Sequence, residues 1–304
     1  NLPILNFKQP QSMTFIANAY FNVSTLTGEG KFEFKKWAVK NYKSFMNTFL
    51  TDIQKSKISS IPKSITHKGK PTVLVIHEHY KEAHAMYRCY HELIVNLKEE
   101  FNVVGLCSKS HSDDASAKDH HEFMVYNSVE DLSEMVDDIL ELKPDVILYP
   151  SLGMNTYSMF LASQRLAPVQ CVCPGHPSSS YFDTIDYMLL EDLGIPHAKL
   201  EEILSEKPVV MDALNLHVVP TPYLLSSEKQ VQPTIQVGIN GVMPKVTDLL
   251  IEICKEISEK AKTNVCFHFF MNSPIQDIEY FSAKSFLRRK LPNSKVHPLA
   301  DFNT

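Results

Sequence analysis

Imidazole side chains gather just after the first strongly apolar run of the chain. Val73 to Ile76 has the composition of a short buried strand, and His77, His79 and His84 follow it. Ligands of open α/β sheets bind beside the carboxyl ends of the strands, so His84 lies where a ligand would dock. It could donate to a phosphate or relay a proton, with His77 and His79 as weaker candidates for the same patch. The alternative is an ordinary histidine in the first turn of a helix.

A polar loop follows another apolar run, at residues 169–172. In the Gly-His-Pro-Ser-Ser-Ser segment of residues 175–180, the proline and the tight turn fix the backbone, so that His176 projects from the end of a strand. The serines add hydroxyl and backbone N–H groups that could bind a phosphate or a sugar. A plain turn is the alternative for this loop.

One lysine in the last quarter of the chain is a candidate for diphosphate binding. Lys245 follows the apolar run at 235–239 and comes at the start of a predicted helix over 246–261. The N-terminus of a helix carries partial positive charge, so an ammonium group beside it adds to a place that already attracts a diphosphate. The alternative is a solvated loop lysine.

The sequence contains few patterns that suit a metal ion. No Asp-x-Asp motif occurs, and the adjacent pairs Asp113-Asp114 and Asp137-Asp138 fall in a predicted loop and a predicted helix. We expect Cys171 and Cys173 to point to opposite faces of a strand, which disfavours a chelate. The six cysteines lie in apolar helix or strand patterns and indicate reduced thiols in a core. We therefore expect no metal and no other cofactor.

Composition and charge exclude several classes of protein. With 304 residues, 44% of them hydrophobic and 21% charged, the chain can form two ordinary globular domains. A formal net charge of −5 argues against broad nucleic-acid binding. No apolar run approaches the roughly 20 residues of a membrane span, and no signal peptide is visible. We expect a cytoplasmic protein whose true N-terminus precedes Asn1.

Helical periodicity comes first along the chain. Apolar residues recur at helical spacing over 13–23 and 32–53, with a turn at 28–30, and a polar, lysine- and serine-rich linker follows over 55–70. This pattern predicts a helical N-terminal segment and linker over residues 1–68.

Short apolar runs then alternate with helical patterns, which predicts parallel βαβ units and an α/β fold. The predicted strands of this part lie near 73–76, 103–107, 146–149, 169–172 and 185–190. We expect a Rossmann-like domain over 69–222 with helices on both faces, a loop over 107–127, and a helix over 128–142 capped by Ser128 with Asp131. Strands near 235–239, 265–269 and 295–296 start a second, incomplete domain over 233–304.

Three separated motifs resemble those of one enzyme family. They are Leu-Ala-Pro-Val-Gln at 166–170, Gly-His-Pro at 175–177 and Thr-Ile-Asp-Tyr at 184–187. Their order is similar to that in the nucleotide-sugar-dependent protein glycosyltransferases of the O-GlcNAc-transferase superfamily, glycosyltransferase family 41. The soluble bacterial asparagine N-glucosyltransferases that modify adhesins are the closest in character, and the resemblance runs from about Val73 to His297.

The resemblance implies an architecture and roles for residues. It implies a GT-B-like fold, in which two Rossmann-type domains with parallel sheets face each other across a ligand cleft. His84 and His176 would then be catalytic, one beside the sugar and diphosphate and the other beside the donor sugar. The residues that would bind the nucleotide-sugar are Lys245, His297, Gly175, Ser178 and Ser179. The family's Pro-Phe-Gly loop would lie beyond Thr304, so we expect this fragment alone to be inactive; Asp186 is more plausibly structural.

Together these features predict a metal-independent inverting glycosyltransferase. It would transfer a hexose, most simply glucose, from UDP-hexose to asparagine in Asn-x-Ser/Thr sites of an acceptor protein such as an adhesin. One alternative is an O-linked protein or polysaccharide glycosyltransferase of the same fold. Another, from a different class, is a non-catalytic glycosyltransferase-like partner or chaperone. We expect no nucleic-acid partner and no membrane span.

Overall fold

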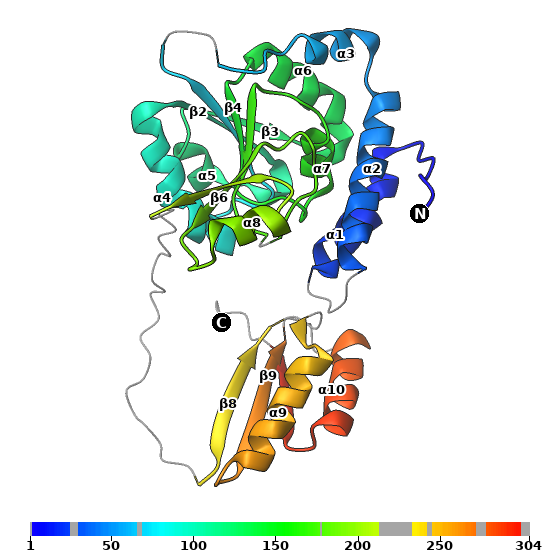
Figure 1. Ribbon diagram of the computed structural model, residues 1–304, viewed down its shortest axis with the longest axis vertical. Coiled ribbons are helices and arrows are strands. Elements are labelled where there is room, and N and C mark those ends of the chain that lie inside the picture. Colours follow the sequence, from blue (N-terminus) through cyan, green and yellow to red (C-terminus); the bar gives the residue numbers. More distant parts are fainter. Residues whose placement is uncertain are drawn as a thin grey trace. The chain divides into compact units, whose positions relative to one another are not determined.

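The computed structural model describes most of the chain in two compact units (Figure 1). The described residues are 2–24, 30–65, 69–176, 178–212, 233–241, 245–271 and 278–298. Those up to Asp212 belong to the first unit, and those from Pro233 onward belong to the second. The predicted turn at 28–30 lies largely outside the described residues. No helix in the described ranges combines the length and the apolarity that crossing a membrane requires.

The first unit is built on a sheet of seven parallel strands within the described residues. The strands are β1 (Thr72–Ile76), β2 (Asn102–Ser108), β3 (Glu122–Tyr126), β4 (Val146–Tyr149), β5 (Val169–Val172), β6 (Tyr187–Glu191) and β7 (Lys207–Met211). Their order is β3-β2-β1-β4-β5-β6-β7, so the first six follow the doubly wound order of dinucleotide-binding folds. The predicted parallel pairing of the first two strands is confirmed, with Val73 opposite Val103.

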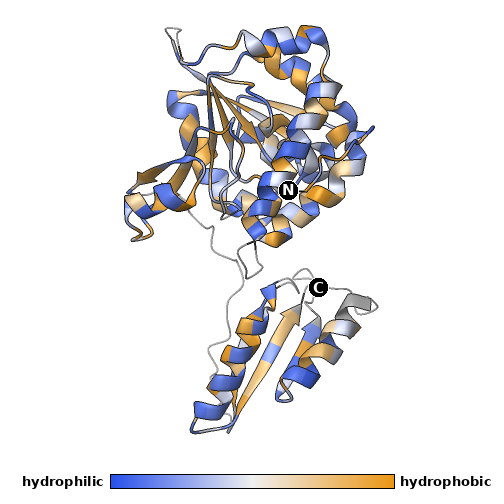
Figure 2. Ribbon diagram, turned by 45° about the vertical axis from the view of Figure 1, so that its right-hand side comes forward, coloured by the Kyte–Doolittle hydropathy of each residue, from blue (hydrophilic) through white to orange (hydrophobic). Residues whose placement is uncertain are grey.

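Both faces of this sheet are covered by helices, as predicted. Val73 and Val75 of β1 pack on one side with α4 (Ala85–Glu100), whereas Leu74 and Ile76 face the other side with α6 (Leu132–Leu142) and α7 (Thr156–Ala162). The strands of this sheet are correspondingly hydrophobic in Figure 2. A strand buried on both faces presents apolar residues at every position, which is why its sequence reads as an unbroken apolar run.

The N-terminal helices share the core of the sheet. They are η1 (Pro10–Met13), α1 (Thr14–Val23), α2 (Lys31–Phe49) and α3 (Asp52–Ser59). Tyr42 and Phe45 of α2 pack their rings against Phe160 of α7, with centroids 4.9 and 5.0 Å apart. Buried aromatic side chains therefore tie α2 to the helices that cover the sheet, close to the carboxyl ends of the strands.

The segment over 107–127, predicted as a loop, contains three elements. They are η2 (Lys109–His111), α5 (Asp114–Lys118) and the edge strand β3. The prediction was wrong because an edge strand carries exposed polar residues and short helices have little periodicity. Asp113 caps α5 by accepting a hydrogen bond from the backbone N–H of Ser116, 3.0 Å away.

Three further sequence predictions need correction, and two short elements were missed. The predicted linker over 55–70 begins inside α3, which a capping box of Thr51 and Gln54 starts. Ser128 does not cap a helix: it begins η3 (Ser128–Asp131), and α6 follows from Leu132. Cys171 and Cys173 pack in the same core cluster, since residues two apart along a strand share a face. Helix α8 (His197–Ile203) and strand β7, both short, were not predicted.

The second unit carries a three-stranded parallel sheet in its described part. Its strands, in the order β10-β9-β8, are β8 (Ile235–Asn240), β9 (Val265–Met271) and β10 (Ser294–Pro298). Helices α9 (Asp248–Lys260) and α10 (Ile278–Lys290) both pack on the face that bears Phe267 and Phe269. The three predicted strands of this unit and the helix predicted over 246–261 are confirmed to within two residues at each end.

Candidate active site

A buried carboxylate holds the loops together at the carboxyl ends of the parallel strands of the first sheet. Glu78, directly after β1, is 1% exposed. Its Oε1 atom accepts hydrogen bonds from the backbone N–H groups of residues 153–155 at 2.8–2.9 Å and from the hydroxyl of Ser158 at 2.5 Å, and Oε2 accepts one from Ser151 at 2.8 Å. Glu78 therefore fills the N-terminus of α7, a place that would otherwise attract a ligand anion. It stood between two predicted histidines in the sequence, but nothing in the pattern showed that its side chain turns inward.

Three imidazole rings meet at this edge. His84 is the N-cap of α4, and its Nδ1 atom accepts a hydrogen bond from the backbone N–H of Met86 at 3.2 Å. The ring of His79 stacks on His84 at a centroid distance of 4.6 Å and meets the ring of His111 edge-on at 4.2 Å. The sequence missed His111 because it was assigned to a loop.

Electrostatics favour the neutral form of all three rings. Partial burial lowers the pKa of His84 and of His111, and burial with the nearby His111 and His84 lowers the pKa of His79 to about 4. A neutral His84 that accepts at Nδ1 carries its proton on Nε2. No hydrogen bond among the described residues engages Nε2, so this N–H can donate to a ligand.

His77 does not lie in this cluster. Its side chain is 2% exposed, its Nε2 atom lies 3.0 Å from Nε2 of His120, and its ring stacks on Tyr80 at 3.9 Å. Burial lowers its pKa well below the usual value. Of the two weaker candidates near His84, only His79 lies with it.

His176 is buried and bound by a lysine from the N-terminal helices. Its Nε2 atom lies 2.9 Å from the hydroxyl of Ser24 and 3.2 Å from the Nζ atom of Lys35 in α2. Lys35, 1% exposed, also donates to the Ser178 hydroxyl at 2.9 Å and stands 4.3 Å from the centre of the Tyr20 ring. Nε2 of His176 is therefore an acceptor that the protein itself satisfies while Lys35 is charged.

Burial lowers the pKa of both partners of this contact, Lys35 and His176. Desolvation lowers the pKa of Lys35 to about 7, although Glu206 opposes the change. Desolvation, followed by the charge of Lys35, lowers the pKa of His176 to about 3. His176 is thus a neutral ring at physiological pH.

A second buried carboxylate anchors the serines that follow. Glu206, 3% exposed, accepts hydrogen bonds from the Ser179 hydroxyl at 2.8 Å and from the backbone N–H and hydroxyl of Ser180. Gly175 is required by close approach, because a Cβ atom there would lie 2.5 Å from the Pro150 carbonyl oxygen. The predicted loop is therefore rigidly built, and Ser178 is the hydroxyl in it that remains partly exposed. Pro177 lies outside the described residues.

The motifs on either side of this loop, at residues 166–170 and 184–187, are joined by hydrogen bonds. Arg165 donates two hydrogen bonds to the Asp186 carboxylate, at 2.5 and 2.9 Å, and the backbone N–H of Gln170 donates a third at 2.8 Å. The Gln170 side chain accepts from the Leu166 N–H and donates to two backbone carbonyls. The structural role expected for Asp186 is confirmed.

In the second unit, one row of side chains crosses the sheet face opposite the helices. Nδ1 of His268 lies 2.8 Å from Nε2 of His297, and Nε2 of His268 lies 2.5 Å from Oε1 of Gln236. The two imidazole rings stack with centroids 5.0 Å apart and planes 5° apart. His297 is half-buried, and the stacked row offers a flat, polar surface. His268 was missed because it sits inside an apolar run.

Lys245 is exposed and lies three residues before α9, whose N-cap is Thr247. It therefore precedes the first turn of the helix rather than lying in it. Residues 242–244, including Pro244, lie outside the described ranges. No group of three histidine, cysteine, aspartate or glutamate side chains within those ranges is arranged to hold a metal ion.

Comparison with known proteins supports the resemblance. The chain is 28% identical over 256 residues to a UDP-glucose:protein N-beta-glucosyltransferase of Actinobacillus pleuropneumoniae serotype 5b, and 28% identical over 246 residues to the protein of that name from serotype 7. The first match covers 79% of this chain and 40% of the relative, and the second covers 77% and 38%. The chain thus spans about two fifths of the length of the curated relatives it matches. No family model matches the chain.

A solved structure shares the fold. A mutant of the Thermobaculum terrenum O-GlcNAc transferase superposes with a TM-score of 0.67 and 11% identity, covering 96% of this chain and 62% of the other. The α/β, GT-B-like fold class expected from the sequence is confirmed, and the chain has homologues that are named protein N-glucosyltransferases.

Proposed function

We propose that the chain is part of a metal-independent inverting glycosyltransferase that transfers glucose from UDP-glucose to asparagine side chains of a protein. The observation that carries the proposal is the 28% identity, over 79% of this chain, to a protein named UDP-glucose:protein N-beta-glucosyltransferase. The shared fold supports it, since the first sheet brings His84 and the 175–180 loop to one edge. An acceptor in Asn-x-Ser/Thr sites, adhesins among the acceptors, and a cytoplasmic location are finer parts of the same proposal.

In the first unit, we assign His84 the direct role. Its free Nε2–H would donate to the sugar or diphosphate as the glycosidic bond breaks and negative charge builds on the departing UDP. His176 would act differently, by shaping the wall of the sugar pocket together with Gly175, Ser178 and Ser179. An inverting transfer also needs the acceptor nitrogen held in line behind the anomeric carbon. As the C–N bond forms and the bond to UDP breaks, the nitrogen gives up one proton, which the departing UDP or solvent takes.

In the second unit, we assign Lys245 to the diphosphate and His297 to the uridine. An exposed ammonium group is available for phosphate, and the stacked rings of His268 and His297 provide a flat surface of the kind on which a base can lie. Lysine and imidazole groups would neutralise the diphosphate without a metal ion.

The proposal is tested with the full-length protein, UDP-glucose and a peptide containing one Asn-x-Ser/Thr site, in buffer with EDTA. Mass spectrometry should show a peptide heavier by one hexose, attached at asparagine. The matched control peptide carries glutamine in place of that asparagine. Transfer that needs added Mg²⁺ or Mn²⁺ would contradict the metal-free mechanism, and hexose on serine would favour the O-linked alternative.

Lys245→Ala sharpens the assignment in the second unit. Losing a preorganised charge at the leaving group typically costs ~3 kcal/mol, or roughly a hundredfold in turnover. The fold should be unaffected because the side chain is exposed. Lys255→Ala, on the same unit, is the control and should transfer glucose normally; a normal rate for Lys245→Ala would remove that residue from the site.

A further inference from the structure

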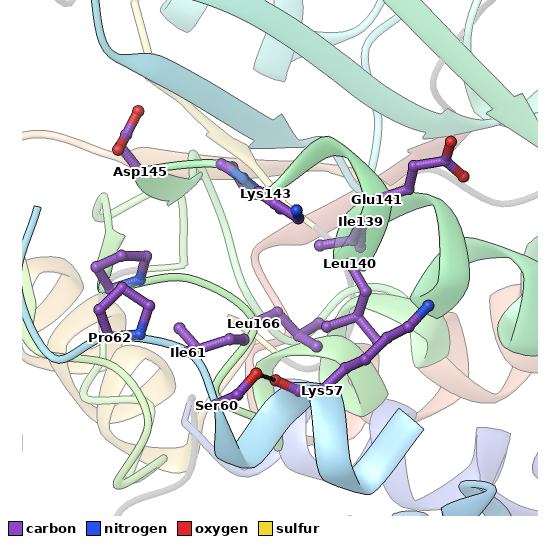
Figure 3. Close-up of a pocket in the computed structure, with 12 residues that line it drawn as sticks. Lys57, Ser60, Ile61, Pro62, Ile139, Leu140, Glu141, Lys143, Asp145 and Leu166 are labelled. Carbon is purple, nitrogen blue, oxygen red and sulfur yellow. Dashed lines mark hydrogen bonds between the residues drawn. The ribbon is translucent and has the colours of Figure 1, made fainter. Parts of the chain in front are cut away.

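A cavity of about 640 Å³ lies at the end of the first sheet opposite the candidate active site (Figure 3). It is lined by the C-terminal ends of α3 and α6, by Ile61 and Pro62, and by the segments that lead into β4 and β5. Its volume is in the range of sites that bind a small organic molecule. The strands of a parallel sheet separate this end from His84, so the cavity is a different site.

The floor of the cavity is apolar and its rim is cationic. Ile139, Leu140 and Leu166 are at most 7% exposed and form the floor, whereas Lys57 and Lys143 are exposed. No ion pair or side-chain hydrogen bond to either ammonium group is recorded in the described part of the chain. In Figure 3 the Lys143 side chain extends toward Ile139.

The lining also holds two carboxylates, Asp145 and Glu141, whose side chains extend away from the apolar residues in Figure 3. Asp145 is buried and accepts a hydrogen bond from the backbone N–H of Thr72 at 2.8 Å. The Glu141 side chain is exposed. Since α3 and α6 both end here, the partial negative charge of their carbonyl ends disfavours an anion on the floor, so any attraction for an anion has to come from the lysines of the rim.

Lys143 occupies a backbone position that favours glycine. It follows the last residue of α6 with φ 51° and ψ 57°, the left-handed conformation at which helices commonly end in glycine. Compared with glycine, a lysine at this position lowers the stability of the helix end, and it places a long cationic side chain in the lining of the cavity. A residue with an unfavourable backbone conformation thus lies in the lining of the cavity.

We propose that this cavity binds a small, free amphipathic anion, an alkyl chain ending in a carboxylate or phosphate group. The aliphatic and proline walls would bury the chain, because removing apolar surface from water is favourable. Lys57 and Lys143 would hold the head group at the rim. Among the described residues of the lining there is no aromatic ring, which disfavours a nucleobase. The site is independent of the proposed transferase activity.

The probes are decanoate and decyl phosphate, titrated by calorimetry below the concentrations at which they form micelles. Either or both should bind with one molecule per chain, and comparison of the two identifies the preferred head group. Decanol, which lacks the charge, and butyrate, which lacks the chain, should each bind at least tenfold more weakly. Equal binding of decanol, or binding only to anionic phospholipid vesicles, would overturn the proposal.

Variants separate the cavity from unspecific binding. Lys143→Gly should weaken decanoate about fivefold, the upper range for one exposed charge pair, while raising the melting temperature because glycine suits the backbone there. Lys57→Gln should weaken it similarly, and Lys55→Gln, on the same helix but outside the lining, should not. Ile61→Trp should fill the cavity and abolish binding. Unchanged affinity in both Lys143→Gly and Ile61→Trp would overturn the proposal even if decanoate binds elsewhere.

Discussion

Two histidines at the same edge of the first sheet, His84 and His176, differ in how fully the protein uses their nitrogen atoms. His84 lies in a half-buried cluster of imidazoles. Its Nδ1 atom caps α4, and its Nε2 atom makes no hydrogen bond with the described residues. His176 is 5% exposed and gives Nε2 to Ser24 and Lys35. The difference teaches that two histidines at the same end of a sheet can be used differently: in one the fold occupies the nitrogen that could reach a ligand, and in the other it leaves that nitrogen available.

The largest effect should come from removing the anchor of the loop that holds His176. Glu206→Ala leaves three buried donors from Ser179 and Ser180 without their acceptor. We expect the free energy of unfolding to fall by about 3–5 kcal/mol, measured by urea denaturation. The control is Glu202→Ala in α8, whose exposed carboxylate pairs with Lys199 and should contribute under about 1 kcal/mol. A small loss for Glu206→Ala would mean that the loop is not built as we describe.

Acid should destabilise the first unit through its buried neutral histidines. Folding holds the pKa of His176 at about 3 and that of His120 at about 4, below the usual value near 6.5. Below pH 6.5 the unfolded chain therefore binds protons that the folded chain does not, and stability falls as pH falls toward 4. The loss should be on the order of 3 kcal/mol from each by pH 4.

The acid effect is checked by urea denaturation between pH 7 and pH 4. His176→Asn should flatten the curve, because asparagine does not titrate. His197→Asn is the matched control, since His197 is exposed and should leave the pH dependence unchanged. A curve for His176→Asn that is as steep as that of the parent protein would show that His176 is not held neutral by burial.

A smaller, more local effect should follow from removing the lysine beside His176. Lys35→Met takes away the second cause of the lowered pKa of His176 and leaves the first, which is burial. The pKa of His176 should therefore rise but stay below its usual value, as followed by NMR titration of the imidazole. Lys36→Met, one residue along α2 and exposed, is the control. No rise in Lys35→Met would contradict the contact.

The sequence was informative where apolar periodicity dominates. Strands such as β1 and β4, buried on both faces, and the amphipathic helix α9 were predicted near their observed bounds. It failed for β3 and β7, which lie at the two edges of the sheet, where one side of the strand is exposed and the apolar run is broken.

The candidate site was predicted less completely than the fold. His84 and the 175–180 loop follow strands, a position that a pattern can reveal. Lys35 and Glu206 reach the same loop from distant helix and strand segments, and only tertiary packing shows that their charges are buried there. The sequence therefore shows which residues could do chemistry, but it does not show the buried partners that set the pKa values of those residues.

The most direct test of the central claim is the rate of glucose transfer by His84→Asn in the full-length protein. Asparagine preserves the helix cap and removes the imidazole, so the melting temperature should stay within about 2 °C of the parent. We predict that transfer to the Asn-x-Ser/Thr peptide slows roughly a hundredfold while the affinity for UDP changes little, because the lost contact tightens only as the glycosidic bond breaks. Transfer at the parent's rate, with the fold intact, would contradict the claim that His84 serves the reaction.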